Sequence, residues 1–285
     1  MESSLSILPL TSTVESDGAT LACYMREGEG TPMLFSHANG FCARMWEPTI
    51  ARLNTAGSVV APDLRGHGAS SSLEPTHENY AWEKYAADLL AVIDSTDIGP
   101  VAGVGHSMGA AALVLAADLE PAKFSSLFLF EPIISPPQFA GLKSPLSDQA
   151  RRRRDSFESR DAARERLGSK APFMFWAPEV FDLYLEFALV SEGEGDGVRL
   201  ACRKEVEAVN YEMGTSHGGW GALERLEIPV TFAAGALSSR EGPIATPPLA
   251  KRVANSRYVE FEDRTHFGPF EDPALCAAEI EAHLS

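Results

Sequence analysis

The stretch VAGVGHSMGA, residues 101–110, decides the fold more than any other part of this sequence. Its apolar start predicts a buried strand, and the segment from residue 110 onward predicts a helix. Between the two, Gly105 and Gly109 stand two residues before and two residues after Ser107. Glycines at these positions let a sharp turn pass close to neighbouring backbone and expose the serine hydroxyl above the sheet. The stretch therefore predicts a strand–turn–helix unit that carries a nucleophilic serine.

Strand and helix patterns alternate along most of the chain. This alternation predicts an α/β fold in which a mainly parallel central sheet has helices on both faces. The first residues differ, because 5–10 and 21–24 together fit an antiparallel hairpin at an edge of the sheet. The remaining strands are predicted at 33–35, 59–61, 101–104, 127–130, 230–233 and 257–261, and the clearest helices at 80–95, 110–119 and 272–284.

The alternation fails between about residues 136 and 226. An Arg-rich run, RRRRDSFESRDAARERL, is followed by the aromatic APFMFWAPEVFDLYLEF and by the acidic turn SEGEGDG. Helical patterns dominate this segment, and strand character returns at Ile228. We therefore predict that 136–226 is a helical insertion into one core domain, which comprises 1–135 and 227–285.

Composition and charge exclude several classes of protein. The formal net charge of −16 disfavours a nucleic-acid partner, and no stretch is long and apolar enough to span a membrane. The first residues lack the pattern of an export signal, so we expect a cytoplasmic protein. The cysteines, Cys23, Cys42, Cys202 and Cys276, form no metal-binding pattern and predict buried, reduced thiols. We expect a small-molecule substrate and no metal, cofactor or membrane partner; the sequence does not indicate an oligomeric state.

A base must activate the serine, because a serine hydroxyl is a poor nucleophile at neutral pH. His266 is the best candidate, since its segment FEDRTHFGPF lies between a predicted strand and the last helix, where a loop reaches the end of the sheet. The other histidines are easier to place elsewhere. His106 lies inside the serine turn, His67 lies in the segment DLRGHG, and His77, His217 and His283 lie in polar surroundings.

These pieces occur in an order that resembles the α/β-hydrolase fold superfamily. The matching motifs are HANGF at 37–41, DLRGHGAS at 63–70, GHSMG at 105–109 and the loop of the base. The resemblance implies a catalytic triad of serine, acid and histidine, and it implies that the insertion is a cap over the active site. It also implies an oxyanion hole made by two backbone amides. We expect these amides from Met108 and Asn39, with Gly40 as the alternative to Asn39, and we expect His37 to orient the loop.

The acid of the triad is the least obvious of these residues. The superfamily most often places it after the strand that begins VTFAAGALSS, but here that loop offers Ser238 and Ser239. Some members place it at the end of the preceding strand, where this chain has Glu131 directly after an apolar run. A carboxylate there would be costly to bury without a partner, and an imidazolium suits it. We predict that Glu131 is the acid rather than Glu241 or Asp263; a glutamate that only caps the strand or pairs with an arginine is the alternative.

The aromatic run of the insertion supplies candidates for a substrate pocket. Phe175 and Trp176 are the predicted substrate-binding residues, while most neighbouring rings fit the core of the insertion. The arginines at 151–154 lie at helical spacing from acidic residues, which indicates a solvated face. We predict a serine hydrolase that cleaves an ester, thioester or lactone through an acyl-enzyme on Ser107. A carbon–carbon bond hydrolase, a perhydrolase or haloperoxidase-like enzyme, and a ligand-sensing receptor without turnover are the alternatives.

Overall fold

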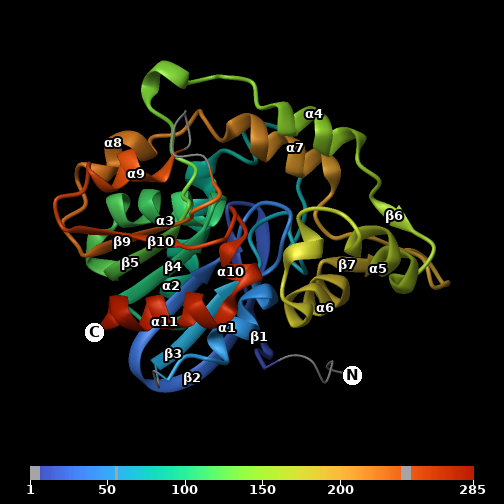
Figure 1. Ribbon diagram of the computed structural model, residues 1–285, viewed down its shortest axis with the longest axis horizontal. Helices are drawn as coiled ribbons and strands as arrows, with labels where there is room; N and C mark the ends of the chain where they lie inside the picture. The colour runs from blue at the N-terminus through green and yellow to red at the C-terminus, as the bar shows by residue number, and fades with distance from the viewer. Residues whose placement is uncertain (1–6, 55–56, 239–244) are drawn as a thin grey trace.

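The computed structural model describes residues 7–54, 57–238 and 245–285. Its main sheet has seven strands; six follow the order β1-β2-β4-β5-β9-β10, and β3 pairs with β2 (Figure 1). The strands from β2 through β4, β5 and β9 to β10 are parallel neighbours, whereas β1 and β3 run antiparallel to β2. The predicted α/β fold with a mainly parallel central sheet is therefore confirmed. The strands are β1 (Leu10–Ser16), β2 (Ala19–Ser36), β3 (Gly57–Pro62), β4 (Val101–His106), β5 (Phe124–Phe130), β9 (Val230–Gly235) and β10 (Ser256–Phe261).

The hairpin expected at the start of the chain forms, but its first strand lies later than predicted. The prediction is wrong at residues 7–9, because β1 begins at Leu10; residues 5 and 6 lie outside the described part of the chain. Asp17 and Gly18 join β1 to β2 with φ values of 43° and 79°. Left-handed values at both central residues are those of a two-residue hairpin turn. This turn, rather than the apolar content of the earlier residues, determines which segment pairs with β2.

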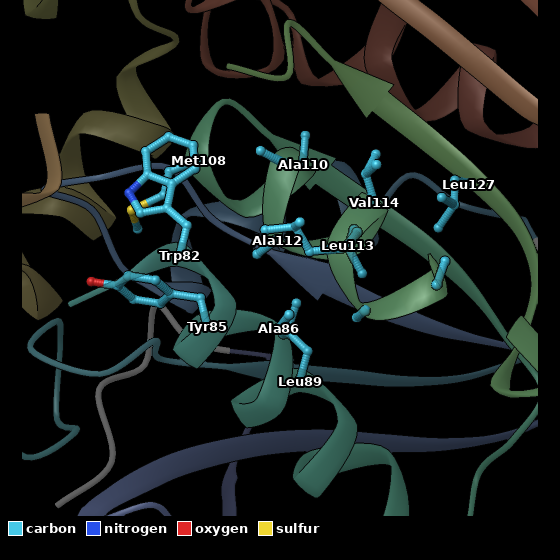
Figure 2. Packing of buried hydrophobic residues seen from close by; sticks show 14 of the residues in the cluster. Trp82, Tyr85, Ala86, Leu89, Met108, Ala110, Ala112, Leu113, Val114 and Leu127 are labelled. Atoms are coloured by element: carbon cyan, nitrogen blue, oxygen red, sulfur yellow. The ribbon is translucent and has the colours of Figure 1, made fainter. Parts of the chain in front are cut away.

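Helices cover both faces of the sheet. α2 (Trp82–Thr96) and α3 (Met108–Leu119) pack together against one face. Figure 2 shows side chains of both helices gathered in one cluster with Leu127 of β5. α1 (Glu47–Ile50) and α11 (Pro273–Leu284) pack against the opposite face, where they form a second apolar cluster with the sheet. The sheet is thus buried on both sides, as the nearly continuous apolar runs of its parallel strands require.

The last helix begins where the sequence predicts. The Asp272 side chain accepts a hydrogen bond of 3.0 Å from the backbone N–H of Leu275, and Pro273 occupies the first helical position. The remaining short helices are η1 (Ala43–Trp46), η2 (Pro121–Lys123), α9 (Thr246–Ala250) and α10 (Gly268–Glu271). A further short helix, α8 (Gly219–Leu223), lies within the predicted insertion and packs in one apolar cluster with α3.

The segment between β5 and β9 contains the helices that the sequence predicts there and a small sheet that it does not. β6, β8 and β7 form a three-stranded antiparallel sheet whose strands are two or three residues long, too short to show a hydrophobic alternation. In Figure 1 these elements gather at the top and right of the main sheet. They are η3 (Pro137–Phe139), α4 (Pro145–Arg152), β6 (Ser156–Phe157), α5 (Arg160–Gly168), η4 (Phe173–Phe175), α6 (Pro178–Phe187), β7 (Leu189–Ser191), β8 (Val198–Leu200) and α7 (Lys204–Met213).

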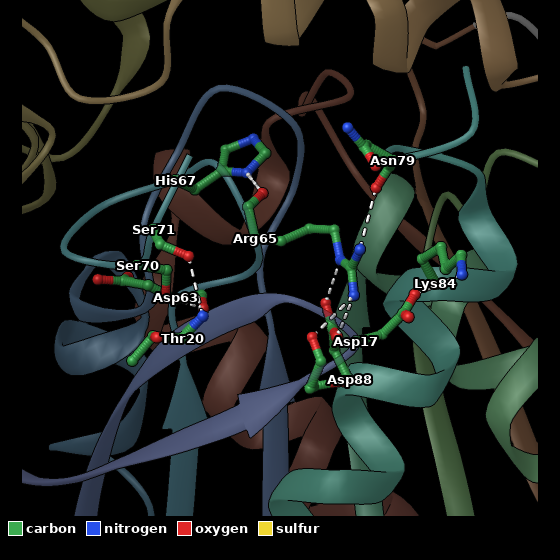
Figure 3. Close-up of polar contacts among 11 residues, drawn as sticks. Asp17, Thr20, Asp63, Arg65, His67, Ser70, Ser71, Asn79, Lys84 and Asp88 are labelled. Atoms are coloured by element: carbon green, nitrogen blue, oxygen red, sulfur yellow. Dashed lines mark hydrogen bonds and ion pairs between the residues drawn. The ribbon is translucent and has the colours of Figure 1, made fainter. Parts of the chain in front are cut away.

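The DLRGHGAS turn after β3 is fixed by buried polar contacts (Figure 3). Arg65 and Asp88 of α2 form a buried ion pair with two hydrogen bonds of 2.6 and 2.7 Å. The Asp63 carboxylate accepts hydrogen bonds from the backbone N–H groups of Ala43 and Ala69, at 2.7 and 2.8 Å. These contacts hold the turn beside the loop that follows β2, so both loops have a defined position at the carboxyl end of the sheet.

Candidate active site

Ser107 lies in a strained turn between β4 and α3. Its φ of 56° and ψ of −115° are values that residues other than glycine rarely adopt. The turn is tight because neighbouring backbone leaves no room for side chains. A Cβ on Gly105 would lie 2.6 Å from Ala110 Cα, and a Cβ on Gly109 would lie 2.4 Å from the carbonyl oxygen of His37. The turn therefore presents the Ser107 side chain at the start of α3. Ser107 as a whole is 8% exposed.

His266 and Glu131 come together at the same end of the sheet. The Nδ1 atom of His266, in the loop after β10, lies 2.7 Å from Oε2 of Glu131, directly after β5. The backbone of the histidine is also held, because the Nε2–H of His106 donates to the carbonyl oxygen of His266 at 2.8 Å. Ser107 is tied to the same place, since its N–H donates to the carbonyl oxygen of Phe130 at 2.9 Å. Ser107, Glu131 and His266 thus follow the carboxyl ends of three strands of one parallel sheet.

Glu131 is held in a conformation and a charge state suited to this contact. Its φ of 43° lies in the left-handed region, which a glutamate adopts only when surrounding contacts impose it. Its Oε1 accepts a hydrogen bond of 2.9 Å from the backbone N–H of Gly235. Burial alone would raise the pKa of the carboxyl, but hydrogen bonds and charge from His266, together with contacts from Ser238 and Gly235, bring that pKa below its ordinary value. Glu131 is therefore ionised at neutral pH.

The end of β9 and the start of the loop after it contact the loop that carries His266. A Cβ on Gly235 would lie 2.3 Å from the carbonyl oxygen of Arg264 and 2.4 Å from that of Thr265. The N–H of Leu237 donates to the carbonyl oxygen of Arg264 at 2.9 Å. Only glycine at position 235 allows this approach, and the backbone N–H of the same residue donates to Glu131.

Of the other two carboxylates weighed as the acid, the structure describes only Asp263. Asp263 lies in the loop before His266 and is exposed. Glu241 and Ser239 lie outside the described residues.

The loop after β2 lies against the serine turn. Because the N–H of Leu64 donates to Nε2 of His37 at 3.0 Å, the proton of the ring is on Nδ1, which donates to the carbonyl oxygen of Ala38 at 2.8 Å. Burial lowers the pKa of His37 to about 4, so the ring is neutral and orients the loop. Asn39 and Gly40 follow, and Met108 is buried in the first turn of α3. The residues predicted to form the oxyanion hole therefore lie in two adjoining segments, and their role stays a prediction.

The two predicted substrate-binding residues have different environments. Trp176 is 6% exposed and its ring lies 5.4 Å from Phe41 of the loop after β2 and 5.9 Å from Phe267, the neighbour of His266. Phe175 is 55% exposed and takes part in none of the ring pairs found among the described residues. The structure thus brings Trp176 next to the candidate catalytic loops and leaves Phe175 at the surface.

The four consecutive arginines do not behave alike. Arg151 and Arg154 pair with Glu212 and Glu158 on the surface, as expected for a solvated face. The Arg153 guanidinium instead lies 2.6 Å from Glu207 of α7, and the Glu207 side chain is buried. Nothing in a run of identical residues indicates which one turns inward, so the sequence could not have identified Arg153.

The part of the chain that the structure describes offers neither a metal site nor a membrane span. Among the described residues, no group of three or more His, Cys, Asp or Glu side chains is arranged to hold a metal ion. No helix in the described part of the chain is both long and apolar enough to cross a membrane.

Known proteins resemble this chain in sequence and in structure. The sequence model of the alpha/beta hydrolase family matches residues 33–279. The chain is 30% identical, over 35% of its own length and 37% of the relative's, to the (E)-2-((N-methylformamido)methylene)succinate hydrolase of Acinetobacter baylyi. It is 32% identical, over 62% of its own length and 80% of the relative's, to the abhydrolase domain-containing protein ACTT2-1 of Alternaria alternata. The match thus spans little more than a third of the first relative and most of the second.

The fold has a close counterpart among solved structures. The enol-lactonase from Burkholderia xenovorans aligns with a TM-score of 0.74 over 96% of this chain and 99% of that one, at 21% sequence identity. At this level of identity the likeness concerns the fold. The arrangement of sheet and helices described above is therefore one that other proteins share.

Proposed function

The chain belongs to the alpha/beta hydrolase family, and on that premise we propose that it hydrolyses an ester, thioester or lactone through an acyl-enzyme on Ser107. The observation that carries the proposal is the 2.7 Å contact between His266 and Glu131 at the end of the sheet where the strained Ser107 turn lies. A nucleophile, a base and a group that orients the base are what this reaction class requires.

The proposed reaction has two halves. In the first, Nε2 of His266 takes the proton of the Ser107 hydroxyl while its oxygen attacks the acyl carbon, and the protonated imidazole then gives that proton to the departing alcohol or thiol. In the second, a water molecule loses a proton to His266 and attacks the acyl-enzyme, which releases the acid and restores the serine. Glu131 keeps the proton of the neutral ring on Nδ1 and stabilises the imidazolium that forms in each half.

The oxyanion of each tetrahedral intermediate needs hydrogen-bond donors that are already in place. We propose the backbone N–H of Met108 as one donor and that of Asn39 or Gly40 as the other. Their segments are held against each other, because Gly109 packs on the backbone of residues 36 and 37. The names of the Acinetobacter hydrolase and of the Burkholderia enol-lactonase describe hydrolytic reactions, which is consistent with the class proposed here.

A substrate panel tests this proposal. The purified protein would be assayed with p-nitrophenyl esters of increasing chain length, with acyl thioesters and with lactones, beside the Ser107→Ala variant. We expect turnover in at least one class by the wild type and none by the variant. Identification of the products separates acyl hydrolysis from cleavage of a carbon–carbon bond or formation of a peracid. Binding of ligands without any turnover, and without labelling of Ser107 by a fluorophosphonate, would overturn the proposal.

A further inference from the structure

The loop that is expected to provide the second oxyanion amide makes a type of turn that has two alternative arrangements. The N–H of Phe41 donates to the carbonyl oxygen of Ala38 at 3.3 Å, so Asn39 and Gly40 are the central residues of a β-turn. The φ of +84° at Gly40 is the value of the third position in a type II turn. Types I and II differ in the orientation of the peptide between the two central residues. The direction of the Gly40 N–H therefore depends on what holds this turn.

Contacts from α7, a helix of the segment predicted as a cap, hold Asn39. The Asn39 side chain donates from Nδ2 to the backbone carbonyl oxygen of Glu207 at 3.0 Å. Its Oδ1 accepts a hydrogen bond of 3.0 Å from Nδ2 of Asn210, one turn further along α7, and lies 3.3 Å from Nε2 of His67. All of these groups are buried. Both ends of the Asn39 amide are thus fixed.

The same turn of α7 also covers Gly40. The Oε1 atom of Glu207 would lie 3.2 Å from a Cβ placed on Gly40. Glu207 is itself held from the other side by Arg153, whose guanidinium lies 2.6 Å from Oε2. Whichever of Asn39 and Gly40 provides the amide, α7 therefore contacts it directly.

A residue of the core domain sets the orientation of the Asn210 amide. The hydroxyl of Tyr85, on α2, donates to Oδ1 of Asn210 at 2.7 Å. Figure 2 shows the hydroxyl end of Tyr85 pointing out of the apolar cluster that surrounds its ring. Because Oδ1 of Asn210 is occupied as an acceptor, its Nδ2 is the atom that faces Asn39. The hydrogen bonds from Tyr85 through Asn210 and Asn39 to Glu207 thus run in one direction, in which each donor strengthens the next.

We infer that Asn210 and Tyr85 are positioning residues, which act through Asn39 to keep the 38–41 turn in the arrangement that directs an N–H toward the oxyanion. This inference rests on the proposed acyl-enzyme function. It gives α7 a role in the chemistry in addition to covering the site, because the oxyanion hole is complete only when α7 is in place. Loss of either residue should weaken stabilisation of the transition state more than binding of the substrate.

The test compares two tyrosines near the start of α2 whose hydroxyls have different hydrogen-bond partners. Tyr80 and Tyr85 are both fully buried, and their rings lie 6.5 Å apart. The Tyr80 hydroxyl accepts from the N–H of Leu73 at 2.9 Å and has no contact with Asn39 among the hydrogen bonds of the described residues. Tyr80→Phe is therefore a matched control for Tyr85→Phe. The measurements are the rate of Ser107 labelling by a fluorophosphonate, kcat and KM for p-nitrophenyl acetate, and the melting temperature.

We expect Tyr85→Phe to lower the labelling rate and kcat about 5- to 20-fold and Asn210→Ala about 10- to 100-fold, since removal of a whole oxyanion donor costs about 10²- to 10³-fold. KM should change less than about twofold in both variants, and the double variant should resemble Asn210→Ala because the two residues act in series. Tyr80→Phe should keep kcat within about twofold even where its melting temperature falls as far as that of Tyr85→Phe.

Two results would overturn the inference. One is that Tyr85→Phe and Asn210→Ala both retain kcat and labelling within about twofold of wild type. The other is that Tyr80→Phe loses as much activity as Tyr85→Phe, which would make the loss a matter of stability. If Asn210→Ala does not fold, the pair of tyrosine variants decides. Failure of the proposed function itself looks different, because the wild type would then not be labelled at Ser107.

Discussion

The Nδ1 atom of His266 lies 2.7 Å from Oε2 of Glu131, although 135 residues separate them along the chain. The second carboxylate oxygen, Oε1, accepts a hydrogen bond from the N–H of Gly235, the last residue of β9. The end of β9 therefore contributes to the site, because its backbone fixes the carboxylate that follows another strand. This relationship makes Glu131 the most informative residue to change.

Glu131→Gln should lower kcat by about 10³- to 10⁴-fold, because the amide does not hold the required tautomer of His266 or stabilise its charged form. Ser238→Ala and Asp263→Asn should each cost less than about tenfold, as should Glu241→Gln. Steady-state kinetics on the best ester of the panel provides the measurement. The role assigned to Glu131 is wrong if its variant stays nearly as active as wild type while one of the others is crippled. Recovery of activity by Ser238→Asp in the Glu131→Gln background would show that the loop after β9 still reaches the histidine.

Ser107→Ala should abolish turnover, with a loss of about 10⁶-fold in kcat, and His266→Ala should match it. The double variant should be no worse than either single one, because the two residues act in one step. A fluorophosphonate should label the wild type and leave the Ser107→Ala variant unlabelled, while circular dichroism shows that both fold. Retention of more than a few per cent of activity in either variant would exclude the acyl-enzyme mechanism.

The stability contributed by Glu131 should depend on pH in a defined direction. The folded-state pKa of Glu131 is below its ordinary value of 4.5, so the unfolded chain binds a proton there more readily than the folded protein does. The contribution is fully present above pH 4.5 and is lost as the pH falls through the folded-state pKa. The difference in free energy of unfolding between wild type and Glu131→Gln, about 1 to 3 kcal/mol for a hydrogen-bonded charge, should therefore shrink as the pH falls below about 4.5.

Urea denaturation at a series of pH values measures this difference. Asp263→Asn, a change at an exposed position of the histidine loop, provides the control for general effects of removing a carboxylate. A difference that grows as the pH falls below 4.5 would contradict the assigned direction of the shift.

Gly235→Ala should disturb catalysis without touching a catalytic side chain. The added methyl group would lie 2.3 Å from the carbonyl oxygen of Arg264, so the loop of His266 must move. We expect a loss of about 1 to 3 kcal/mol in stability and at least about tenfold in kcat, since small displacements of reacting groups are costly. Gly195→Ala, at a position with no atom within 4 Å of the new methyl group, should change neither quantity appreciably. Equal behaviour of the two variants in kinetics and thermal unfolding would count against the close approach.

Trp176→Ala should change both stability and substrate preference. Its buried ring contacts Phe41 and Phe267, so its removal should cost about 3 to 5 kcal/mol and should favour bulkier acyl chains. Phe175→Ala, at a residue that is 55% exposed, should change stability by less than about 0.5 kcal/mol. Relative kcat/KM across the ester panel, measured below the melting temperature, tests the preference. A uniform loss across all chain lengths would assign Trp176 to the core alone.

Much of the fold could be predicted because local patterns and the central sheet agree. The apolar runs at 101–104, 127–130 and 230–233 lie within β4, β5 and β9. A run of this kind is buried on both faces in any parallel sheet, so its position along the chain is sufficient to identify it. The first strand begins later than predicted, because an edge strand needs few apolar residues to mark it. The Asp17-Gly18 turn determines its position instead.

The sequence by itself determined which residues are the candidates for the chemistry. Ser107 is marked by its glycines, and His266 and Glu131 by their places after strands, because parallel strands bring their carboxyl ends to one edge whatever the rest of the chain does. Only the tertiary structure decided which partners these residues meet. The packing of α7 over the 38–41 turn decides two of these contacts. It turns Arg153 inward rather than Arg151, and it lets Asn210 hold Asn39. The contacts of Asn39 with α7 join segments more than 150 residues apart through buried hydrogen bonds, which no local pattern encodes.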